Sequence, residues 1–213
     1  PPDSPTTPWP PANVAALIGN SPLDPDQLAE RLPPDAFESA AAWHRAAHNY
    51  QALLIREQVE TLRRLAYRPT GGFVVAHLAD LRAGMFPSLV DHTGTPKPAY
   101  AAMQAACAPV LVTLDGWPSC AHPGERLEAA VHLINGSRSD LTGARCGVAL
   151  RWDGDGDDWE FEGDLAADSV GLVGRISVTV PDGIDRIDAV LHVIGDRELA
   201  DARYTVPVHL HVG

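Results

Sequence analysis

The sequence predicts a mixed α + β chain in two parts, helices with one buried strand up to residue 109 and a β-sandwich over residues 110–213. Two observations support this fold class. Apolar residues recur at helical spacing before Pro109 and at a spacing of two after it. The second part holds about seven short alternating stretches separated by turn-forming residues, which is the pattern of an immunoglobulin-like sandwich.

Composition limits the classes of partner. The 213 residues suffice for one large or two small domains. With 16 Lys and Arg against 28 Asp and Glu, the net charge of −12 repels phosphates and anionic lipids, so neither a nucleic acid nor a membrane is expected as a partner. No stretch reaches the ~20 apolar residues of a membrane span, and these residues contain no signal-peptide pattern, so we expect a cytoplasmic protein. The three cysteines lack the spacing of a disulfide scaffold or zinc site.

The chain opens on a proline-rich stretch, residues 1–34. Proline fixes the backbone φ angle and removes a hydrogen-bond donor, so we expect irregular structure here, with a short helix over residues 26–31. The first residue is Pro1 instead of Met, which indicates a segment cut from something longer. Such a stretch is expected to wrap over the surface of a larger scaffold.

A long amphipathic helix is predicted next. Asp35 and Glu38 have the spacing of a capping box, which marks a helix start. Apolar residues then recur with helical period as far as Leu65. This pattern predicts one long helix, or two helices with a break near Asn49, ending before Pro69.

A continuous apolar run, Phe73–Leu78, follows the helix and predicts a strand buried on both faces of a parallel sheet. A turn-rich loop over residues 79–98 and an alanine-rich helix over residues 99–108 come next. Helix, buried strand, loop and helix in this order are typical of an α/β layer or barrel. One strand does not make a sheet, so its neighbours are expected upstream of residue 1 or in another chain.

After Pro109 the pattern predicts seven strands that alternate between a buried and an exposed face. Their expected ranges are 110–114, 127–133, 146–152, 159–162, 176–180, 187–193 and 204–210. Because both sheets of such a sandwich bury one face, this part is expected to form its own core.

Two patterns raise the question of a metal ion. The run 153–158 resembles the start of a calcium loop, but Asp158 and Asp164 stand where that loop needs Gly and Glu. An acidic hairpin turn explains the run equally well. His44 and His48 lie one helical turn apart, but the Glu of a zinc-protease motif is missing, so a solvated helix face is favoured. We expect no metal and no other cofactor.

Carboxylates are the remaining candidates for chemistry. Asp80 and Asp91 flank the loop after the predicted buried strand, where barrel enzymes place catalytic groups. Glycoside hydrolysis needs two carboxyl groups held ~5–9.5 Å apart. Nothing in the sequence makes these two face each other, and hydrogen bonds within turns explain loop aspartates as well.

Five short motifs lie between residues 50 and 112. They are Gln58-x-Glu60-x-x-Arg63, Tyr67-Arg68-Pro69-Thr70-Gly71-Gly72-Phe73, Pro87-Ser88-Leu89-Val90-Asp91-His92, Pro96-Lys97-Pro98-Ala99-Tyr100 and Ala108-Pro109-Val110. Together they resemble glycoside hydrolase family 2, and within it the β-mannosidase and exo-β-glucosaminidase branch. In that family the Thr-Gly-Gly segment leads into the eighth strand of a (β/α)8 TIM barrel, and an immunoglobulin-like domain follows the last barrel helix.

The resemblance implies that residues 1–109 are the end of a TIM-barrel catalytic domain and residues 110–213 an immunoglobulin-like β-sandwich. It implies a parent that is a retaining β-glycosidase, with its nucleophile and acid/base both before residue 1. No residue of this chain would then be catalytic. The expected partners are barrel strands 1–7 of the same polypeptide and a β-linked carbohydrate. The residues expected in one wall of the sugar pocket are His77, Asp80, Asp91 and His92.

The chain departs from the family pattern at two positions. Ala76 stands where the eighth strand usually ends in a Trp that forms the floor of the sugar pocket, and Ala79 replaces the Asn of an Asn-Asp pair. The loss of an aromatic platform weakens stacking against a sugar. An alternative function is therefore a non-catalytic sugar-binding or interaction sandwich, for which Trp117, Trp152 and Trp159 are candidate contacts.

Overall fold

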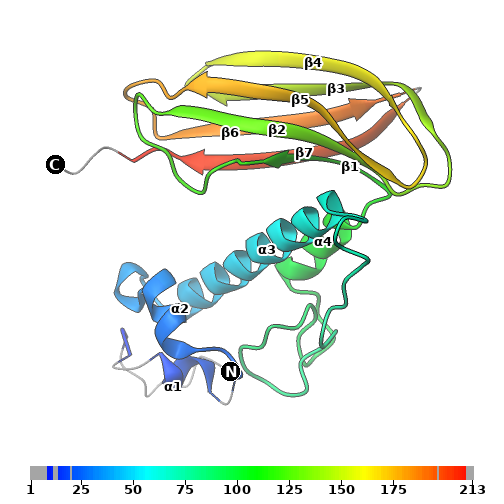
Figure 1. Ribbon diagram of the computed structural model, residues 1–213. Helices are drawn as coiled ribbons and strands as arrows, with labels where there is room; N and C mark the ends of the chain where they lie inside the picture. Colours follow the sequence, from blue (N-terminus) through cyan, green and yellow to red (C-terminus); the bar gives the residue numbers. More distant parts are fainter. Residues whose placement is uncertain (1–8, 12–13, 20, 196, 210–213) are drawn as a thin grey trace. The chain divides into compact units, whose positions relative to one another are not determined.

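The computed structural model describes residues 9–11, 14–19, 21–195 and 197–209 (Figure 1). Helices come first and strands follow. The helical elements are α1 (Ala15–Ile18), α2 (Pro25–Arg31), the 3-10 helix η1 (Pro34–Ala36), α3 (Ala40–Arg64) and α4 (Pro98–Ala106). The strands are β1 (Val110–Asp115), β2 (Arg126–Asn135), β3 (Leu141–Trp152), β4 (Asp155–Leu165), β5 (Ser169–Thr179), β6 (Arg186–Ile194) and β7 (Glu198–Pro207).

Contacts within the chain define two units. The helical unit comprises Pro1–Val59 and Phe73–Ala106, and the sandwich unit comprises Glu60–Gly72 and Cys107–Gly213. The last turn of α3 therefore belongs with the strands. Residues 107–109 fall in the sandwich unit by this division. The expected domain boundary between residues 109 and 110 stays a prediction.

The sandwich unit consists of two antiparallel sheets, with strand orders β1-β2-β5 and β4-β3-β6-β7. All seven stretches predicted from the alternating pattern form strands. The last predicted strand, 204–210, corresponds to β7, which begins earlier, at Glu198, and ends at Pro207; residue 210 lies outside the described residues. Strand β4 lies at an edge of its sheet and is rich in carboxylates. These are Asp155, Asp157, Asp158, Glu160, Glu162 and Asp164.

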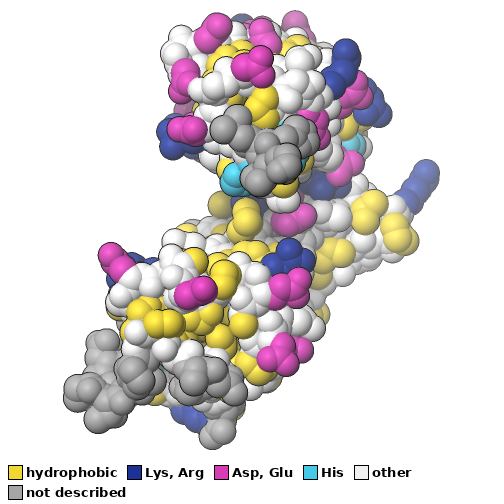
Figure 2. Space-filling model, turned by 90° about the vertical axis from the view of Figure 1, so that its left-hand side faces the viewer, with side chains coloured by type: hydrophobic (Ala, Val, Ile, Leu, Met, Phe, Trp, Pro, Cys, Tyr) yellow, Lys and Arg dark blue, Asp and Glu magenta, His cyan; other side chains and the backbone are white. Residues whose placement is uncertain are grey.

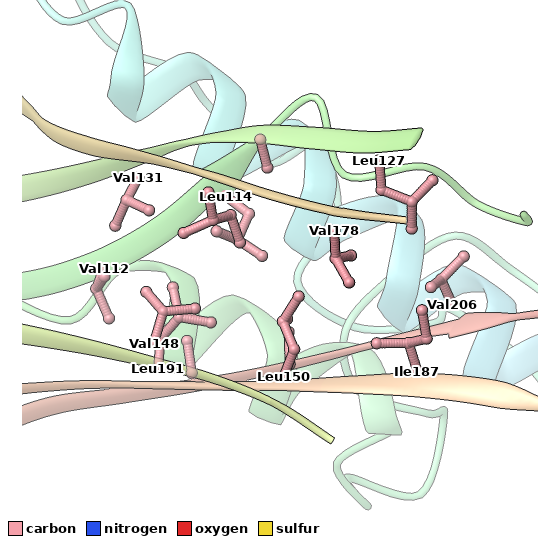
Figure 3. Packing of buried hydrophobic residues seen from close by; sticks show 14 of the residues in the cluster. Val112, Leu114, Leu127, Val131, Val148, Leu150, Val178, Ile187, Leu191 and Val206 are labelled. Carbon is pink, nitrogen blue, oxygen red and sulfur yellow. The ribbon is translucent and has the colours of Figure 1, made fainter. Parts of the chain in front are cut away.

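Aliphatic side chains from both sheets form the core of the sandwich. Figure 3 shows Val112 and Leu114 on one side pointing toward Val148 and Leu191 on the other. Leu150 and its neighbours in this cluster are completely or almost completely removed from solvent. Burial of one such side chain stabilises the fold by about 1.5–3 kcal/mol. Burial also raises the pKa of the Cys146 thiol to about 11.

The helical unit is built on α3, which is one continuous helix of 25 residues without a break at Asn49. The predicted capping box at Asp35 and Glu38 is wrong, because Phe37 between them has an extended backbone. The helix begins at Ala40, and Ser39 caps it: the Ser39 hydroxyl accepts a hydrogen bond of 3.2 Å from the amide of Ala42.

A small apolar cluster lies beside the start of α3. Its buried members are Val14, Ile18, Trp43, Ala47 and Met85. Trp43 is completely buried and satisfies its indole N–H by donating to the carbonyl of Leu32 at 2.8 Å. This explains how a short helical unit keeps a large aromatic side chain inside.

The predicted buried strand Phe73–Leu78 is not a strand in the structure. Its residues pair with no strand among the described residues, and Val74 is 94% exposed. The prediction rested on the continuous apolar run, but a strand forms only where a neighbour satisfies its backbone N–H and C=O groups. The end of a TIM barrel is therefore not shown. The chain is a mixture of helices and antiparallel sheets.

The surfaces of the two units differ in composition. On the face shown in Figure 2, charged side chains are spread over the sandwich unit, whereas hydrophobic side chains gather on the helical unit. In the part of the chain that the structure describes, no helix combines the length and apolar character required to cross a membrane.

Candidate functional site

A cavity of about 400 Å³ lies in the helical unit, in the loop region that follows residue 76. Its lining residues are Pro22, His77, Ala79, Asp80, Leu81, Arg82, Phe86, Pro87 and Ser88. Two of the four residues predicted for a pocket wall, His77 and Asp80, are thus brought together here. Asp91 and His92 do not line this cavity.

A buried ion pair joins Asp80 of the cavity lining to Lys97. The Lys97 ammonium is 2.9 Å from Oδ1 and 2.8 Å from Oδ2 of Asp80. The side chains of Asp80 and Lys97 are only 1% and 3% exposed. The Ser88 hydroxyl donates a further hydrogen bond to Asp80 Oδ1. Because Lys97 balances its charge and Oδ1 accepts hydrogen bonds from Lys97 and Ser88, Asp80 is poorly suited to act as a general base or nucleophile, although Oδ2 accepts no hydrogen bond.

Local backbone contacts position Asp80 and Lys97. The amide of Asp80 donates to the carbonyl of Val90 at 3.0 Å, and the amides of Leu89 and Val90 donate to the carbonyl of Leu78. Lys97 directly precedes α4, and its carbonyl accepts a hydrogen bond from the amide of Tyr100. Hydrogen bonds therefore fix the backbone at Asp80 and at Lys97, the two residues whose side chains form the ion pair.

His77 is one of several exposed residues in the lining. Its backbone φ is +68°, a left-handed conformation that is uncommon for a residue with a side chain. Such conformations persist where the surrounding structure determines them, and they are frequent at functional sites. The position of His77 at the cavity thus depends on the segment that follows it.

Asp91 stabilises its own loop. Its Oδ1 accepts hydrogen bonds from the Thr93 hydroxyl at 2.6 Å and from the amides of Thr93 and Thr95. These hydrogen bonds lower the pKa of the Asp91 carboxyl, and the one from the Thr93 hydroxyl contributes most. This is the turn arrangement that the sequence offered as the alternative to catalysis. His92 is exposed, and a role for either residue in a sugar-binding wall stays a prediction.

The two sequence patterns that raised the question of a metal ion form a hairpin turn and part of a helix face. Asp153 and Gly154 form the two-residue turn between β3 and β4, both with positive φ, as in type I′ hairpins. His44 and His48 lie on α3 with ring centroids 6.5 Å apart, and burial, the largest cause, lowers the pKa of His48. Among the described residues, no group of three or more His, Cys, Asp or Glu side chains is placed to hold a metal ion.

The tryptophans proposed as sugar contacts belong to the sandwich. Trp117, Trp152 and Trp159 are partly buried and pack against its hydrophobic core. An aromatic platform for a sugar needs an exposed ring face. These three residues therefore serve mainly to close the core.

Sequence reasoning missed the role of Lys97 and Ser88, which complete the buried network around Asp80. A lysine between two prolines was taken only as part of a family motif. One signal was present in the composition. Lys97 is the single lysine among the 16 basic residues of the chain, and all the others are arginine.

Comparisons with known proteins support the resemblance at the level of fold. No family model matches the chain, and no curated protein matches it either. An exo-chitosanase, CsxA of Amycolatopsis orientalis, matches 85% of this chain with a TM-score of 0.63 and 18% identity. A β-D-mannosidase of Dictyoglomus thermophilum matches 82% of it with a TM-score of 0.67 and 15% identity.

In both cases the match covers 21% of the other protein, so the chain spans about a fifth of the length of the enzymes it resembles. Identities of this size establish the fold and not the activity. The prediction of a likeness to the β-mannosidase and exo-β-glucosaminidase branch is confirmed in that sense: the chain has the fold of a segment of these glycoside hydrolases.

Proposed function

We propose that this chain is the C-terminal part of a retaining β-glycosidase of glycoside hydrolase family 2. The observation that carries the proposal is the match of more than four-fifths of the chain to one fifth of an exo-chitosanase and of a β-mannosidase. The exo-chitosanase binds a nitrophenyl β-D-glucosamine in one of its structures. A β-linked sugar is accordingly the substrate class proposed for the full-length protein.

In this proposal, residues 1–109 form the end of a (β/α)8 barrel. Exposed apolar side chains between Phe73 and Leu81 support this assignment. Val74 and Leu81 are each 94% exposed, which is costly for aliphatic side chains in water. Neighbouring barrel strands, supplied by an upstream part of the same polypeptide, would cover such side chains and pair with the backbone.

Residues 110–213 are proposed to be an immunoglobulin-like domain. The strand orders β1-β2-β5 and β4-β3-β6-β7 support this, because the first, second and fifth strands lie in one sheet and the third, sixth and seventh in the other, as in seven-stranded immunoglobulin domains. The fourth strand differs, because it pairs with the third instead of joining the first sheet. The core in Figure 3 is made by the facing sides of these sheets. The role of this domain would be to support the barrel.

The chain is proposed to be inactive by itself. Asp80 is the only carboxylate in the lining of the described cavity, and Lys97 balances its charge. Glycoside hydrolysis with retention uses two carboxyl groups ~5–5.5 Å apart, one as nucleophile and one as acid and base. Both would come from the upstream part, whereas this chain would supply a pocket wall with His77 at its surface and Asp91 and His92 in the adjoining loop.

The test compares this chain with a full-length polypeptide that contains it, on nitrophenyl β-mannoside, β-glucosaminide, β-glucoside and β-galactoside. We expect hydrolysis by the full-length protein and none by the chain, with circular dichroism as the control for folding. NMR of the first-formed sugar should show the β-anomer, as retention requires. Hydrolysis by the chain alone at enzymic rates, or by neither protein, would overturn the proposal.

A further inference from the structure

We infer that Lys97 ties together the two stretches of chain that line the cavity, residues 77–82 and residues 86–88 (its two walls), and so positions His77. The effect of this tie on substrate binding rests on the proposed function, whereas the tie itself does not. The inference comes from the set of groups that the ammonium joins.

One wall of the cavity follows residue 76, and Lys97 holds it through Asp80. His77, Ala79, Asp80, Leu81 and Arg82 belong to this wall. Both carboxylate oxygens of Asp80 lie within 2.9 Å of the ammonium. Since Leu78 is hydrogen-bonded to Leu89 and Val90, the backbone from residue 78 to residue 80 has little freedom to move.

The other wall consists of Phe86, Pro87 and Ser88. Lys97 Nζ donates to the carbonyl of Phe86 at 2.9 Å and to the Ser88 hydroxyl at 3.2 Å. Gln51 of α3 supports the same wall by donating to the carbonyls of Pro87 and Ser88. A single buried ammonium thus binds residues of both walls.

The chemistry of lysine suits this position. An ammonium has three N–H donors arranged around one atom, and here they reach three separate groups, Asp80, Phe86 and Ser88. An arginine presents its donors as a flat fork that fits a single carboxylate, so it would not reproduce this arrangement. A lysine occurs here in a chain whose 15 other basic residues are all arginine.

His77 is the exposed lining residue whose position we expect the contacts of Lys97 to affect. It lies three residues before Asp80 and has the left-handed backbone conformation described above. If Lys97 no longer joins Asp80 to Phe86 and Ser88, the surroundings of the His77 side chain at the cavity change, although the backbone hydrogen bonds of Leu78 to Leu89 and Val90 remain. Lys97 is therefore a positioning residue that acts through Asp80 on His77.

The first test uses NMR of this chain and does not depend on any activity. The variants are Lys97→Arg, which keeps the charge, and the double variant Asp80→Asn with Lys97→Met, which removes both charges and leaves no buried ion unpaired. The matched control is Arg45→Met, because Arg45 is an exposed cation of the same helical unit. The His77 imidazole signal is assigned with a His77→Ala variant.

We expect the His77 signal to shift or broaden in both Lys97 variants and to stay unchanged in the control. Signals of the sandwich histidines His132 and His192 should not move in any of them, which separates a local effect from general unfolding. An unchanged His77 signal in both folded variants overturns the inference.

The second test uses the full-length enzyme and measures KM and kcat separately. A displaced binding wall should raise KM by about tenfold for Lys97→Arg, with kcat changed less than about threefold. An equal loss in Arg45→Met, or a fall in kcat with KM unchanged, contradicts a positioning role. If the full-length protein hydrolyses no β-glycoside, the proposed function fails, and the NMR result still decides whether Lys97 positions His77.

Discussion

The sandwich unit and the helical unit achieve their folds by different means. The sandwich buries a continuous cluster of aliphatic side chains that includes Val112, Leu150 and Ile187. The helical unit has a smaller apolar cluster around Trp43 and, at a separate place, the ion pair of Asp80 and Lys97. Hydrophobic burial does not depend on direction, whereas an ion pair is favourable only in one geometry.

This difference teaches which part of the chain tolerates change. The sandwich shares its stability among many similar contacts, so one truncation removes only a part of it. The loop region of the helical unit depends on a few polar groups that are buried together. It also leaves Val74 and Leu81 in water, which no position in the sandwich core does.

The largest effect is expected for Asp80→Ala. This substitution leaves the Lys97 ammonium buried without its counter-charge, so it should destabilise the helical unit by about 3–5 kcal/mol. Hydrogen exchange of the amides from Leu78 to Val90 measures the loss. Asp35→Ala is the control, because Asp35 is exposed. A loss below about 1 kcal/mol would mean that the ion pair adds little to this unit.

A slightly smaller effect is expected for Leu150→Ala in the sandwich. Leu150 is completely buried, so its truncation should lower the free energy of unfolding by about 3 kcal/mol. Leu172→Ala is the matched control, since Leu172 is more than half exposed and should change stability by less than about 0.5 kcal/mol. Urea unfolding of both variants gives the two values. Equal losses would contradict the description of the core.

Tyr204→Phe should cost about 1 kcal/mol. The Tyr204 hydroxyl donates to Glu60 Oε2 at 2.8 Å, and Glu60 is buried at the end of α3. Tyr67 offers the control, because its hydroxyl also donates to a carboxylate, that of Asp168 at 2.7 Å, but its side chain is 61% exposed. Tyr67→Phe should therefore be nearly neutral, and a larger loss there than at Tyr204 would reverse the argument from burial.

The smallest effect is expected for Val74→Ser. In this chain the Val74 side chain is almost fully in water, so the free energy of unfolding, measured by thermal unfolding, should change by less than about 0.5 kcal/mol. In a full-length polypeptide that supplies neighbouring strands, the same substitution should cost about 1–2 kcal/mol, because the valine would be buried there. No difference between the two settings would argue against the proposed barrel strand.

The strands were predictable because their signal is local. Val148 and Leu150 alternate with the smaller Gly147 and Ala149, and Asp153-Gly154 marks the turn, so the pattern itself indicates which face is buried. The start of α3 was not predictable from spacing alone. Asp35 and Ser39 both have side chains that can cap a helix, and the choice between them depends on the extended backbone of Phe37.

The candidate site was only partly predictable, since it depends on contacts between residues distant in the sequence. The position of His77 and Asp80 after an apolar run pointed to the cavity region. No local pattern brings Lys97, 17 residues later, back to Asp80. Asp91, which has the same residue type and a similar loop setting, bonds instead to its own turn.

The acidic strand β4 has a consequence for how the molecule behaves in concentrated solution. An edge strand exposes unpaired backbone groups to which another copy of the chain is able to add. Six carboxylates lie along this edge, so a second copy that approached through its own β4 would bring like charges together at the spacing of neighbouring strands, ~4.8 Å. The repulsion disfavours pairing of two copies through β4, and it weakens when salt screens the charges.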